Sequence, residues 1–211
     1  MQANFQTVCR AMDVPPEQTA SCHLVHGADI ITVERANQRM VMGTADGLIT
    51  RDPGVFLFMR FADCTPLLFF DPEQGAVGIT HAGWRGTMQN AALATVRAMQ
   101  QRFGSRPAKI IAAIGPAIGP CCYEVGPEVI AAGRDSLPDG SSLFAANGRA
   151  GHAHFDMWAA NRRQLQMAGV DEILESRLCT ACRTDHFFSH RAEQGKTGRF
   201  GVIIGLRSNI A

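Results

Sequence analysis

The stretch Gly78–Gln100, GITHAGWRGTMQNAALATVRAMQ, decides the fold because it joins two kinds of secondary structure. Its first residues read as a buried β-strand, and the apolar residues of Thr87–Arg102 recur at the spacing of one helix face. A strand that leads into an amphipathic helix is typical of α/β proteins. The corner between them, residues 81–86, holds a histidine, a tryptophan and an arginine where a small turn would suffice, so it is a candidate functional site.

The rest of the chain alternates between strand-like and helical segments in the same way. Helices are predicted over Asn4–Met12, at the end of residues 119–133, and over residues 155–169, where Gly169 takes the position of a C′ glycine. Strands are predicted within residues 21–26, 29–34, 44–50, 54–71 (two strands), 75–83, 109–115 and 199–207. The turn-rich stretch Gly133–His154 is expected to be a long surface loop. This order predicts a single α/β domain over residues 1–211.

Composition excludes several classes of protein. The chain has 211 residues, of which 46% are hydrophobic, enough for one sizeable core. Twenty basic and nineteen acidic residues leave a net charge of +1, which gives no electrostatic reason to expect a nucleic-acid or membrane partner. No apolar run has the length of a membrane span, and no signal peptide is seen. Seven irregularly spaced cysteines fit a reducing compartment, so we expect a cytoplasmic protein.

Three residues that can bind metals interrupt apolar strand sequences. His26 follows a strand just before Gly27, Cys64 lies between two strands, and His81 ends the strand at the corner. Each alone is commonly a satisfied histidine or an inert thiol, but such strand ends are where α/β proteins place their chemistry. Two imidazoles and a thiolate suit zinc and leave one tetrahedral position open. Their scattered positions do not by themselves establish the site.

The corner also has the features of an anion site. Gly83 and Gly86 allow a tight turn, and the N-terminus of the helix expected from Thr87 lies next to Arg85. A helix N-terminus beside an arginine is a receptor for phosphate or carboxylate. In the alternative interpretation, Arg85 pairs with a local carboxylate, either Asp46 or Asp63.

Two further segments are candidates of lower specificity. The stretch 185–201 carries Phe187, Phe188 and Arg191, which in a cleft would stack on a flat base and bind an anion; in an ordinary hairpin one phenylalanine would enter the core. Cys179 and Cys182 form a C-x-x-C motif. Because no second such motif follows and residues 121 and 122 are vicinal cysteines, we interpret this pair as two ordinary thiols.

Seven motifs occur in a characteristic order along residues 4–206. They are LVHGADI, TADGLIT, FADCTPLLFFD, ITHAGWRGT, IGPAIGPCCYEVGPEV, CTACRTDHFFSHR and TGRFGVIIGL. Together they resemble the multicopper polyphenol oxidase, or laccase-domain, family. This is the YfiH/YlmD-like group, also called peptidoglycan editing factors and including FAMIN-type purine nucleoside phosphorylases.

The resemblance carries expectations about fold, metal and activity. It implies a layered α/β/β/α sandwich, and a zinc site on the histidines of VHG and HAGWRG and the cysteine of ADC, which here are His26, His81 and Cys64. It implies phosphorolysis of adenosine, inosine, guanosine or S-methyl-5′-thioadenosine, and deamination of adenosine. Members usually begin further upstream, with a glycine- and serine-rich segment near the site, so the given sequence is expected to lack that segment.

The first hypothesis is therefore a zinc-dependent purine nucleoside phosphorylase and adenosine deaminase, monomeric or homodimeric, acting on small molecules. Cys64 and His81 would hold the metal at the reacting centre with His26, and Asp63 would stabilise the sugar cation. The anion and base would be bound by the residues at the corner and in the later segment: Arg85, Gly86, Phe187, Phe188 and Arg191.

Three other functions remain open. A copper-dependent polyphenol oxidase is compatible with His and Cys ligands, although the chain has only seven histidines for a multicopper relay. A cysteine hydrolase acting on peptidoglycan precursors would use Cys64 as nucleophile and His81 as base. In a non-enzymatic interaction module the metal would be structural, with a fourth ligand such as Cys122.

Overall fold

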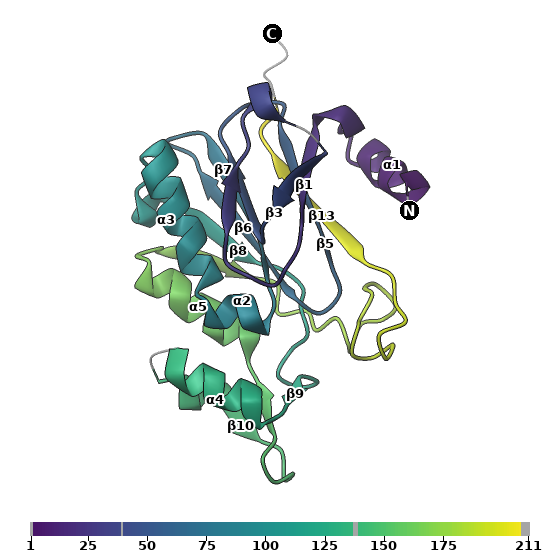
Figure 1. Cartoon of the computed structure of the whole chain (residues 1–211), viewed down its shortest axis with the longest axis vertical. Helices are drawn as coiled ribbons and strands as arrows, with labels where there is room; N and C mark the ends of the chain where they lie inside the picture. Colours follow the sequence, from purple (N-terminus) through teal and green to yellow (C-terminus); the bar gives the residue numbers. More distant parts are fainter. Residues whose placement is uncertain (1, 39, 137–138, 208–211) are drawn as a thin grey trace.

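Two β-sheets packed face to face form the centre of the chain, and helices lie on their outer sides (Figure 1). The computed structural model describes residues 2–38, 40–136 and 139–207. The predicted α/β fold, with sheets between helices, is confirmed. The strands are β1 (Thr19–His23), β2 (Ile30–Thr32), β3 (Val41–Thr44), β4 (Gly47–Thr50), β5 (Phe56–Phe61), β6 (Thr65–Asp71), β7 (Ala76–Ala82), β8 (Ile111–Ile114), β9 (Glu124–Val125), β10 (Phe144–Ala146), β11 (Ala153–Phe155), β12 (Glu172–Glu175) and β13 (Phe200–Gly205).

The helices fall between these strands. The α-helices are α1 (Gln2–Ala11), α2 (Trp84–Met88), α3 (Ala91–Phe103), α4 (Pro127–Ser136) and α5 (Met157–Met167). Short 3₁₀ helices are η1 (Pro16–Gln18), η2 (Arg35–Asn37), η3 (Pro107–Lys109) and η4 (Gly140–Leu143). Among the described helices, none combines the length and apolar character that a membrane span requires.

The larger sheet has the strand order β12-β8-β6-β7-β4-β2. Its central strands β8, β6, β7 and β4 pair antiparallel with one another, while the edge strands β12 and β2 pair parallel with β8 and β4. The smaller sheet has the order β13-β5-β1-β3, in which only the β13–β5 pair is antiparallel. Each sheet is therefore mixed, and the chain crosses between sheets several times.

Alternation along β7 places its side chains in two different cores. Val77 and Ile79 pack between the sheets, against side chains such as Leu57 of β5. On the opposite face the Thr80 hydroxyl lies 2.6 Å from that of Thr95 in α3. By the same alternation His81 points toward the smaller sheet, so the space between the sheets ends in a polar side chain.

Helix α3 covers the outer face of the larger sheet together with α5 (Figure 1). Val96, Met99 and Phe103 recur at helical spacing and are buried against that sheet. Each such side chain contributes about 1.5–3 kcal/mol relative to an exposed position. The helix ends at Gly104, whose left-handed conformation (φ 73°) is that of a helix C-terminal glycine.

The prediction of one continuous helix over Thr87–Arg102 is wrong. The structure has α2 and α3 in its place, separated at Asn90, which adopts a left-handed conformation with φ 60°. A left-handed residue cannot continue an α-helix, and asparagine tolerates this conformation better than most residues. The start of the helical stretch also differs, because α2 begins at Trp84 and both Arg85 and Gly86 lie inside it rather than before it.

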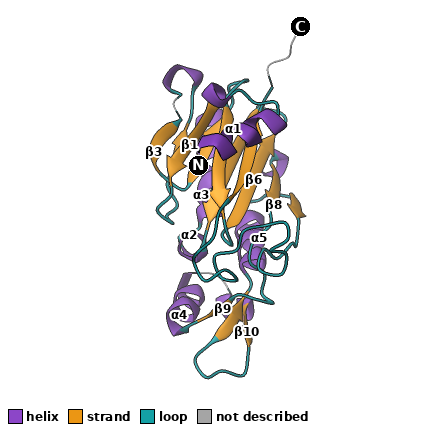
Figure 2. Cartoon of the chain, turned by 90° about the vertical axis from the view of Figure 1, so that its right-hand side faces the viewer, coloured by secondary structure: helices purple, strands orange, loops and turns teal. Residues whose placement is uncertain are grey.

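The prediction of a surface loop over Gly133–His154 is also wrong. Within its described part the chain completes α4, forms η4, and then builds β10 and β11, which pair with β9 in a third sheet of order β10-β11-β9. Apolar side chains that the turn-rich composition concealed, such as Leu143 and Phe155, are buried there. Figure 2 shows α4, β9 and β10 at one end of the molecule.

Candidate metal centre and substrate site

The three predicted metal-binding residues lie together at the end of the two large sheets. His26 is in the turn that follows β1, Cys64 immediately precedes β6, and His81 is the penultimate residue of β7. The nitrogen and sulfur atoms that these residues offer all lie within 4.8 Å of one another. The two imidazole rings meet edge to face, with 5.0 Å between their centroids.

A buried aspartate holds two of these residues in place. Asp46 is fully buried and accepts backbone N–H bonds from Val25 (3.1 Å), His26 (3.0 Å) and Gly27 (2.7 Å). Its Oδ1 atom also lies 2.9 Å from Nδ1 of His81. These bonds support the left-handed backbone of His26 (φ 62°). They also leave Nε2 of His81 as the ring nitrogen that faces the cluster.

The glycines of HAGWRG permit close packing around the cluster. A side chain at Gly83 would place its Cβ 3.0 Å from Sγ of Cys64 and 3.2 Å from Cδ2 of His26. A Cβ at Gly86 would lie 2.7 Å from the carbonyl oxygen of Gly27. Gly86 is therefore a packing residue that lets α2 approach the His26 turn, and α2 has only five residues. The expected phosphate receptor at a helix N-terminus after Gly86 is not formed.

Charge couples the cysteine and the histidine of the cluster. Burial raises the pKa of Cys64, but hydrogen bonds from His26 and His81 outweigh burial and lower this pKa to about 7. Burial lowers the pKa of His81, but its bonds to Asp46 and Cys64 prevail and raise this pKa to about 9. The carboxyl pKa of Asp46 is lowered, because the bonds it accepts outweigh its burial. The metal-free cluster is thus a thiolate–imidazolium pair near neutral pH.

The donor set fits a transition metal. Two imidazoles and one thiolate are ligands of zinc, and the carboxylate that orients His81 is the usual outer partner of a metal-bound histidine. The same donors also accept copper. The structure thus brings together the predicted ligand trio His26, Cys64 and His81.

Two arginines and a tyrosine border the cluster. The guanidinium of Arg191 lies 5.1 Å from the ring centroid of Tyr123, and that of Arg85 lies 4.2 Å from the ring of Trp84. Burial raises the pKa of Tyr123, the negative charge of Cys64 adds to this, and both arginines oppose it. The phenol therefore lies within the electrostatic reach of the thiolate and of both arginines. Tyr123 was not identified from the sequence.

Asp63 connects the cluster to the segment that carries Arg191. Its carboxylate accepts the Thr180 hydroxyl (2.6 Å) and the backbone N–H of Arg191 (2.6 Å), one on each oxygen. The residue is buried and its backbone is left-handed, with φ 79°. Asp46 and Asp63 are thus bonded to other residues, and the alternative pairing of Arg85 with either is not seen in their described contacts.

The two phenylalanines differ in their surroundings. Phe187 is half-buried and packs against Phe200 of β13, with 5.3 Å between centroids. Phe200 in turn packs on Phe61, whose ring lies 5.5 Å from that of His81. Phe188 is 44% exposed and rests on Gly198. Phe187 therefore belongs to the aromatic packing behind the centre, while Phe188 offers an accessible ring.

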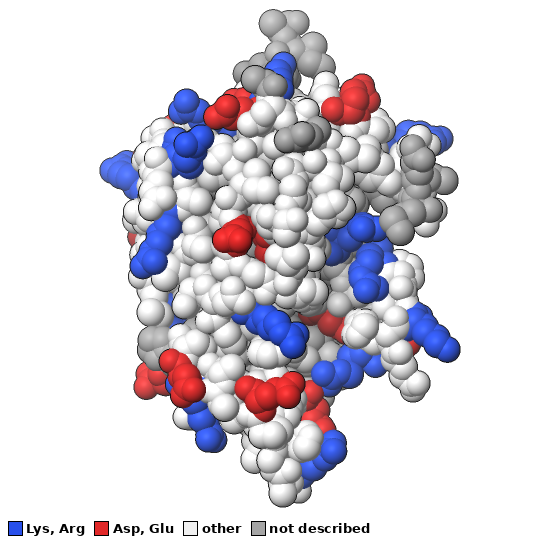
Figure 3. All heavy atoms as spheres, in the orientation of Figure 1, with Lys and Arg blue, Asp and Glu red and all other residues white. Residues whose placement is uncertain are grey.

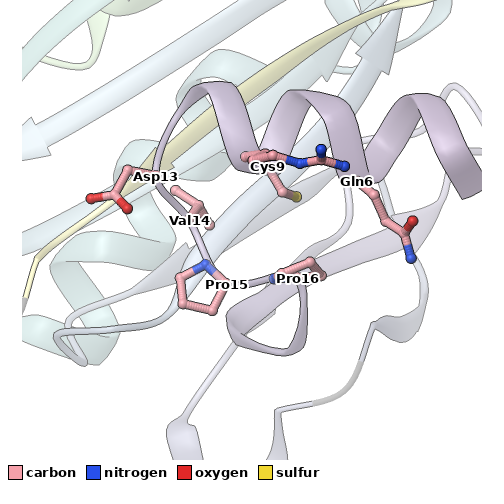
Figure 4. Close-up of a pocket in the computed structure, with 7 residues that line it drawn as sticks. Gln6, Cys9, Asp13, Val14, Pro15 and Pro16 are labelled. Atoms are coloured by element: carbon pink, nitrogen blue, oxygen red, sulfur yellow. The ribbon is translucent and has the colours of Figure 1, made fainter.

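A separate hollow of about 430 Å³ lies between α1 and the turn that follows it (Figure 4). It is lined by Gln6, Cys9, Arg10, Asp13, Val14, Pro15 and Pro16. None of the predicted site residues lines this hollow, and its lining brings no metal-ligand group together. The candidate site is therefore the cluster of His26, Cys64 and His81. On the face shown in Figure 3, acidic and basic side chains are interspersed, in keeping with the net charge of +1.

The geometry agrees with the relationships of the chain. Residues 1–207 match the family described as multi-copper polyphenol oxidoreductase laccase. The chain belongs to this family. It is 44% identical to the purine nucleoside phosphorylase YlmD of Geobacillus stearothermophilus over 97% of this chain and 78% of the relative. It is 37% identical to adenosine deaminase RL5 of an unknown prokaryotic organism over 88% of this chain and 72% of the relative.

A solved structure of the family has the same fold. The crystal structure of YlmD from Geobacillus stearothermophilus superposes with a TM-score of 0.92 at 40% sequence identity, covering 97% of this chain and 79% of that chain. The resemblance predicted from the seven motifs is confirmed. The family description refers to oxidation of polyphenols, whereas the relatives' names refer to nucleoside phosphorolysis and deamination.

The structure also overturns one interpretation of the sequence. Cys179 and Cys182 are not two ordinary thiols, because Cys121 and Cys122 lie beside them and the four sulfur atoms are all within 4.8 Å of one another. The sequence concealed this group, since its two halves come from turns far apart in the chain.

Proposed function

We propose that the chain is a zinc-dependent purine nucleoside phosphorylase that also deaminates adenosine. Its substrates are adenosine, inosine, guanosine and S-methyl-5′-thioadenosine. The observation that carries the proposal is the convergence of His26, Cys64 and His81 within 4.8 Å, beside two arginines. The names of the relatives, purine nucleoside phosphorylase and adenosine deaminase, support it.

The residues divide the task between them. His26, Cys64 and His81 hold zinc, which supplies a Lewis acid that polarises oxygen atoms of the reactants. Asp46 engages Nδ1 of His81, so Nε2 would be the ring nitrogen that binds the metal. The carboxylate oxygens of Asp63 are both bonded within the protein, so we assign it to positioning Arg191 instead of acting on the sugar.

Phosphate and base are bound on the side of Tyr123. Arg85 and Arg191 present guanidinium groups suited to phosphate binding, with Nη1 of Arg191 held by the Glu124 carbonyl (2.7 Å). The Tyr123 hydroxyl donates to the same anion. The exposed ring of Phe188 stacks on the purine, with Phe187 supporting the segment from behind. In phosphorolysis a phosphate oxygen bonds to C1′ of the ribose while the C1′–N9 bond breaks. The purine leaves with the electron pair and takes up a proton.

The first experiment combines metal analysis with an adenosine assay run with and without phosphate. We expect zinc in the purified protein, adenine and ribose 1-phosphate only when phosphate is present, and inosine in either case. Cys64→Ser should lose zinc from this centre and both reactions, whereas Cys9→Ser in α1 should retain them. Full nucleoside turnover by metal-free Cys64→Ser would refute the proposal.

Replacement of Arg85 tests the phosphate site. Arg85→Ala should raise the KM for phosphate by about tenfold or more, since a charge-assisted bond contributes about 1.5–3 kcal/mol. Deamination of adenosine needs no phosphate and should keep its kcat and KM. An equal loss of both reactions would mean that Arg85, stacked on Trp84, has only a structural role.

Copper provides one alternative outcome of the metal analysis. The ligand set accepts copper, and the family description refers to polyphenol oxidation. Copper in the purified protein, oxidation of phenols and no turnover of nucleosides would replace the phosphorylase by an oxidase.

A cysteine hydrolase acting on peptidoglycan precursors is a second candidate, favoured by one observation. Asp46 bonds to His81, and His81 bonds to Cys64, as in a carboxylate–base–nucleophile triad. The pKa of the Cys64 thiol is also lowered to about 7. A thiolate bound to zinc is not a free nucleophile, so the two functions respond oppositely to a chelator. Chelation should abolish nucleoside turnover, whereas a hydrolase would be active without metal and inactivated by iodoacetamide.

A further inference from the structure

Four cysteines from two segments that lie far apart in the sequence meet next to Tyr123. Cys121 and Cys122 lie in the turn between β8 and β9, and Cys179 and Cys182 lie in the turn after β12. Sγ of Cys182 is 3.6 Å from that of Cys121 and 3.4 Å from that of Cys122. All four sulfur atoms lie within 4.8 Å of one another, and all four thiols are free.

These separations suit a single tetrahedral ion. Zinc–sulfur bonds of about 2.3 Å in a tetrahedron put neighbouring sulfur atoms about 3.8 Å apart. The observed distances lie around that value, whereas a disulfide needs sulfur atoms about 2.05 Å apart. With four sulfur atoms all within 4.8 Å of one another, the group has the form of a complete ligand set instead of one redox pair.

The backbone around Cys179 is arranged for a thiolate. The N–H of Gly119 donates to its Sγ at 3.2 Å, and the N–H of Cys182 donates to the same sulfur. The Arg183 N–H bonds to the carbonyl of Cys179 and closes a turn around the C-x-x-C. Cys179 is buried, while Cys121 and Cys182 are exposed, so an ion can enter from solvent and still be anchored inside. Backbone donors to the sulfur are the usual support of cysteine ligands.

We propose that Cys121, Cys122, Cys179 and Cys182 bind a second zinc ion, separate from the centre at His26, Cys64 and His81. Four thiolates favour zinc and leave no open position, so this ion is structural.

The ion cross-links two turns that otherwise share little secondary structure. Ala117 and Cys179 form an isolated parallel bridge, with the Ala117 N–H bonded to the Leu178 carbonyl and the Thr180 N–H to the Ala117 carbonyl. The first turn leads directly to Tyr123, and the second contains Thr180, whose hydroxyl donates to Asp63. The second zinc thus fixes the backbone on which Tyr123 and Arg191 are mounted.

The test is metal stoichiometry in the full chain, purified under reducing conditions and loaded with zinc alone. The wild-type chain should bind about two equivalents of zinc, because each of the two ligand clusters holds one ion. Cys182→Ser and Cys121→Ser, at exposed positions, should each lose one equivalent; Cys9→Ser should lose none. His81→Ala should lose the other equivalent only, so failure at one centre is distinguishable from failure at the other.

Thiol counting gives an independent readout that does not depend on a variant folding. In the zinc-loaded wild type the four thiols should resist a thiol reagent until a chelator is added, and the bound zinc should be released with them. Unchanged zinc content in both serine variants would overturn the proposal. So would a protein mass lower by two hydrogens that maps to a disulfide within the group, with one zinc equivalent in all.

Discussion

At the scale of the residue, some side chains of the candidate centre can be predicted from the sequence and others cannot. His26, Cys64 and His81 were identified because each is a polar break in an apolar segment. Asp46 was considered only as a partner of Arg85, because its actual role arises from four bonds to residues 19–35 positions away that only the folded chain brings together. A buried carboxylate of this kind has no local sequence signature.

The thiolate–imidazolium pair gives a pH prediction for the metal-free chain. A lowered pKa means that Cys64 is deprotonated as pH rises through about 7, instead of near its ordinary value of 9.0. Its rate of alkylation, followed by peptide mass analysis, should rise with a midpoint near pH 7. His81→Ala should move this midpoint upward, and bound zinc should suppress alkylation. A midpoint near 9 in the wild type would contradict the pairing.

Gly83 tests how closely the backbone must approach the ligands. Gly83→Ala keeps an ordinary backbone conformation, since φ is −76°, but its Cβ presses on Cys64 and His26. Zinc affinity at this centre should fall by about tenfold or more, as for other changes that displace ligands. Competition with a chromophoric chelator measures it. Gly126→Ala, where a Cβ meets no atom within 4 Å, is the matched control and should bind zinc normally.

At the scale of the element, strands were predicted better than helix boundaries. The strands β5, β6, β7 and β13 follow from apolar runs, whereas the break between α2 and α3 depends on one left-handed residue inside a continuous helical pattern. The edge strands β3 and β12 were missed because all of their residues are exposed or only partly buried. Periodicity reports the buried face of an element, and it is weakest where an element is short or lies at an edge.

Asn90 is the residue that decides this break. Asn90→Ala should destabilise the chain by about 1–2 kcal/mol, because the left-handed conformation at this position is costly for alanine. Asn90→Gly, which adopts that conformation freely, should lie within about 0.5 kcal/mol of wild type. Urea unfolding measures both. A more stable Asn90→Ala variant would mean that α2 and α3 gain from merging.

At the scale of the whole molecule, the hydrophobic cores on the two faces of the larger sheet differ in their relation to the site. The core between the sheets includes Phe61, whose ring contacts both His81 and Phe200. The core under α3 and α5 includes Phe69, on the opposite side of the larger sheet. The layered order of these cores followed from the family resemblance, whereas the third sheet and the four-cysteine group did not, because they depend on contacts between distant turns.

A pair of truncations separates stability from metal binding. Phe61→Ala and Phe69→Ala each remove a fully buried ring and should each cost about 3–5 kcal/mol in urea unfolding. Only Phe61→Ala should also weaken zinc binding at His81, because its ring supports that imidazole. Equal zinc affinities in the two variants, measured where both remain folded, would show that the aromatic contact does not position the ligand.

The pairing of β13 with β5 has a consequence for the chain during its synthesis. β5 pairs with β1 on one side soon after it emerges from the ribosome, but its other side waits for β13, from Phe200 to Gly205. Until then an apolar strand edge stays open to neighbouring nascent chains. Translation that stalls before β13 would therefore leave a polypeptide that has all three predicted metal ligands but an unpaired apolar edge on β5. Such a polypeptide would be a substrate for chaperones.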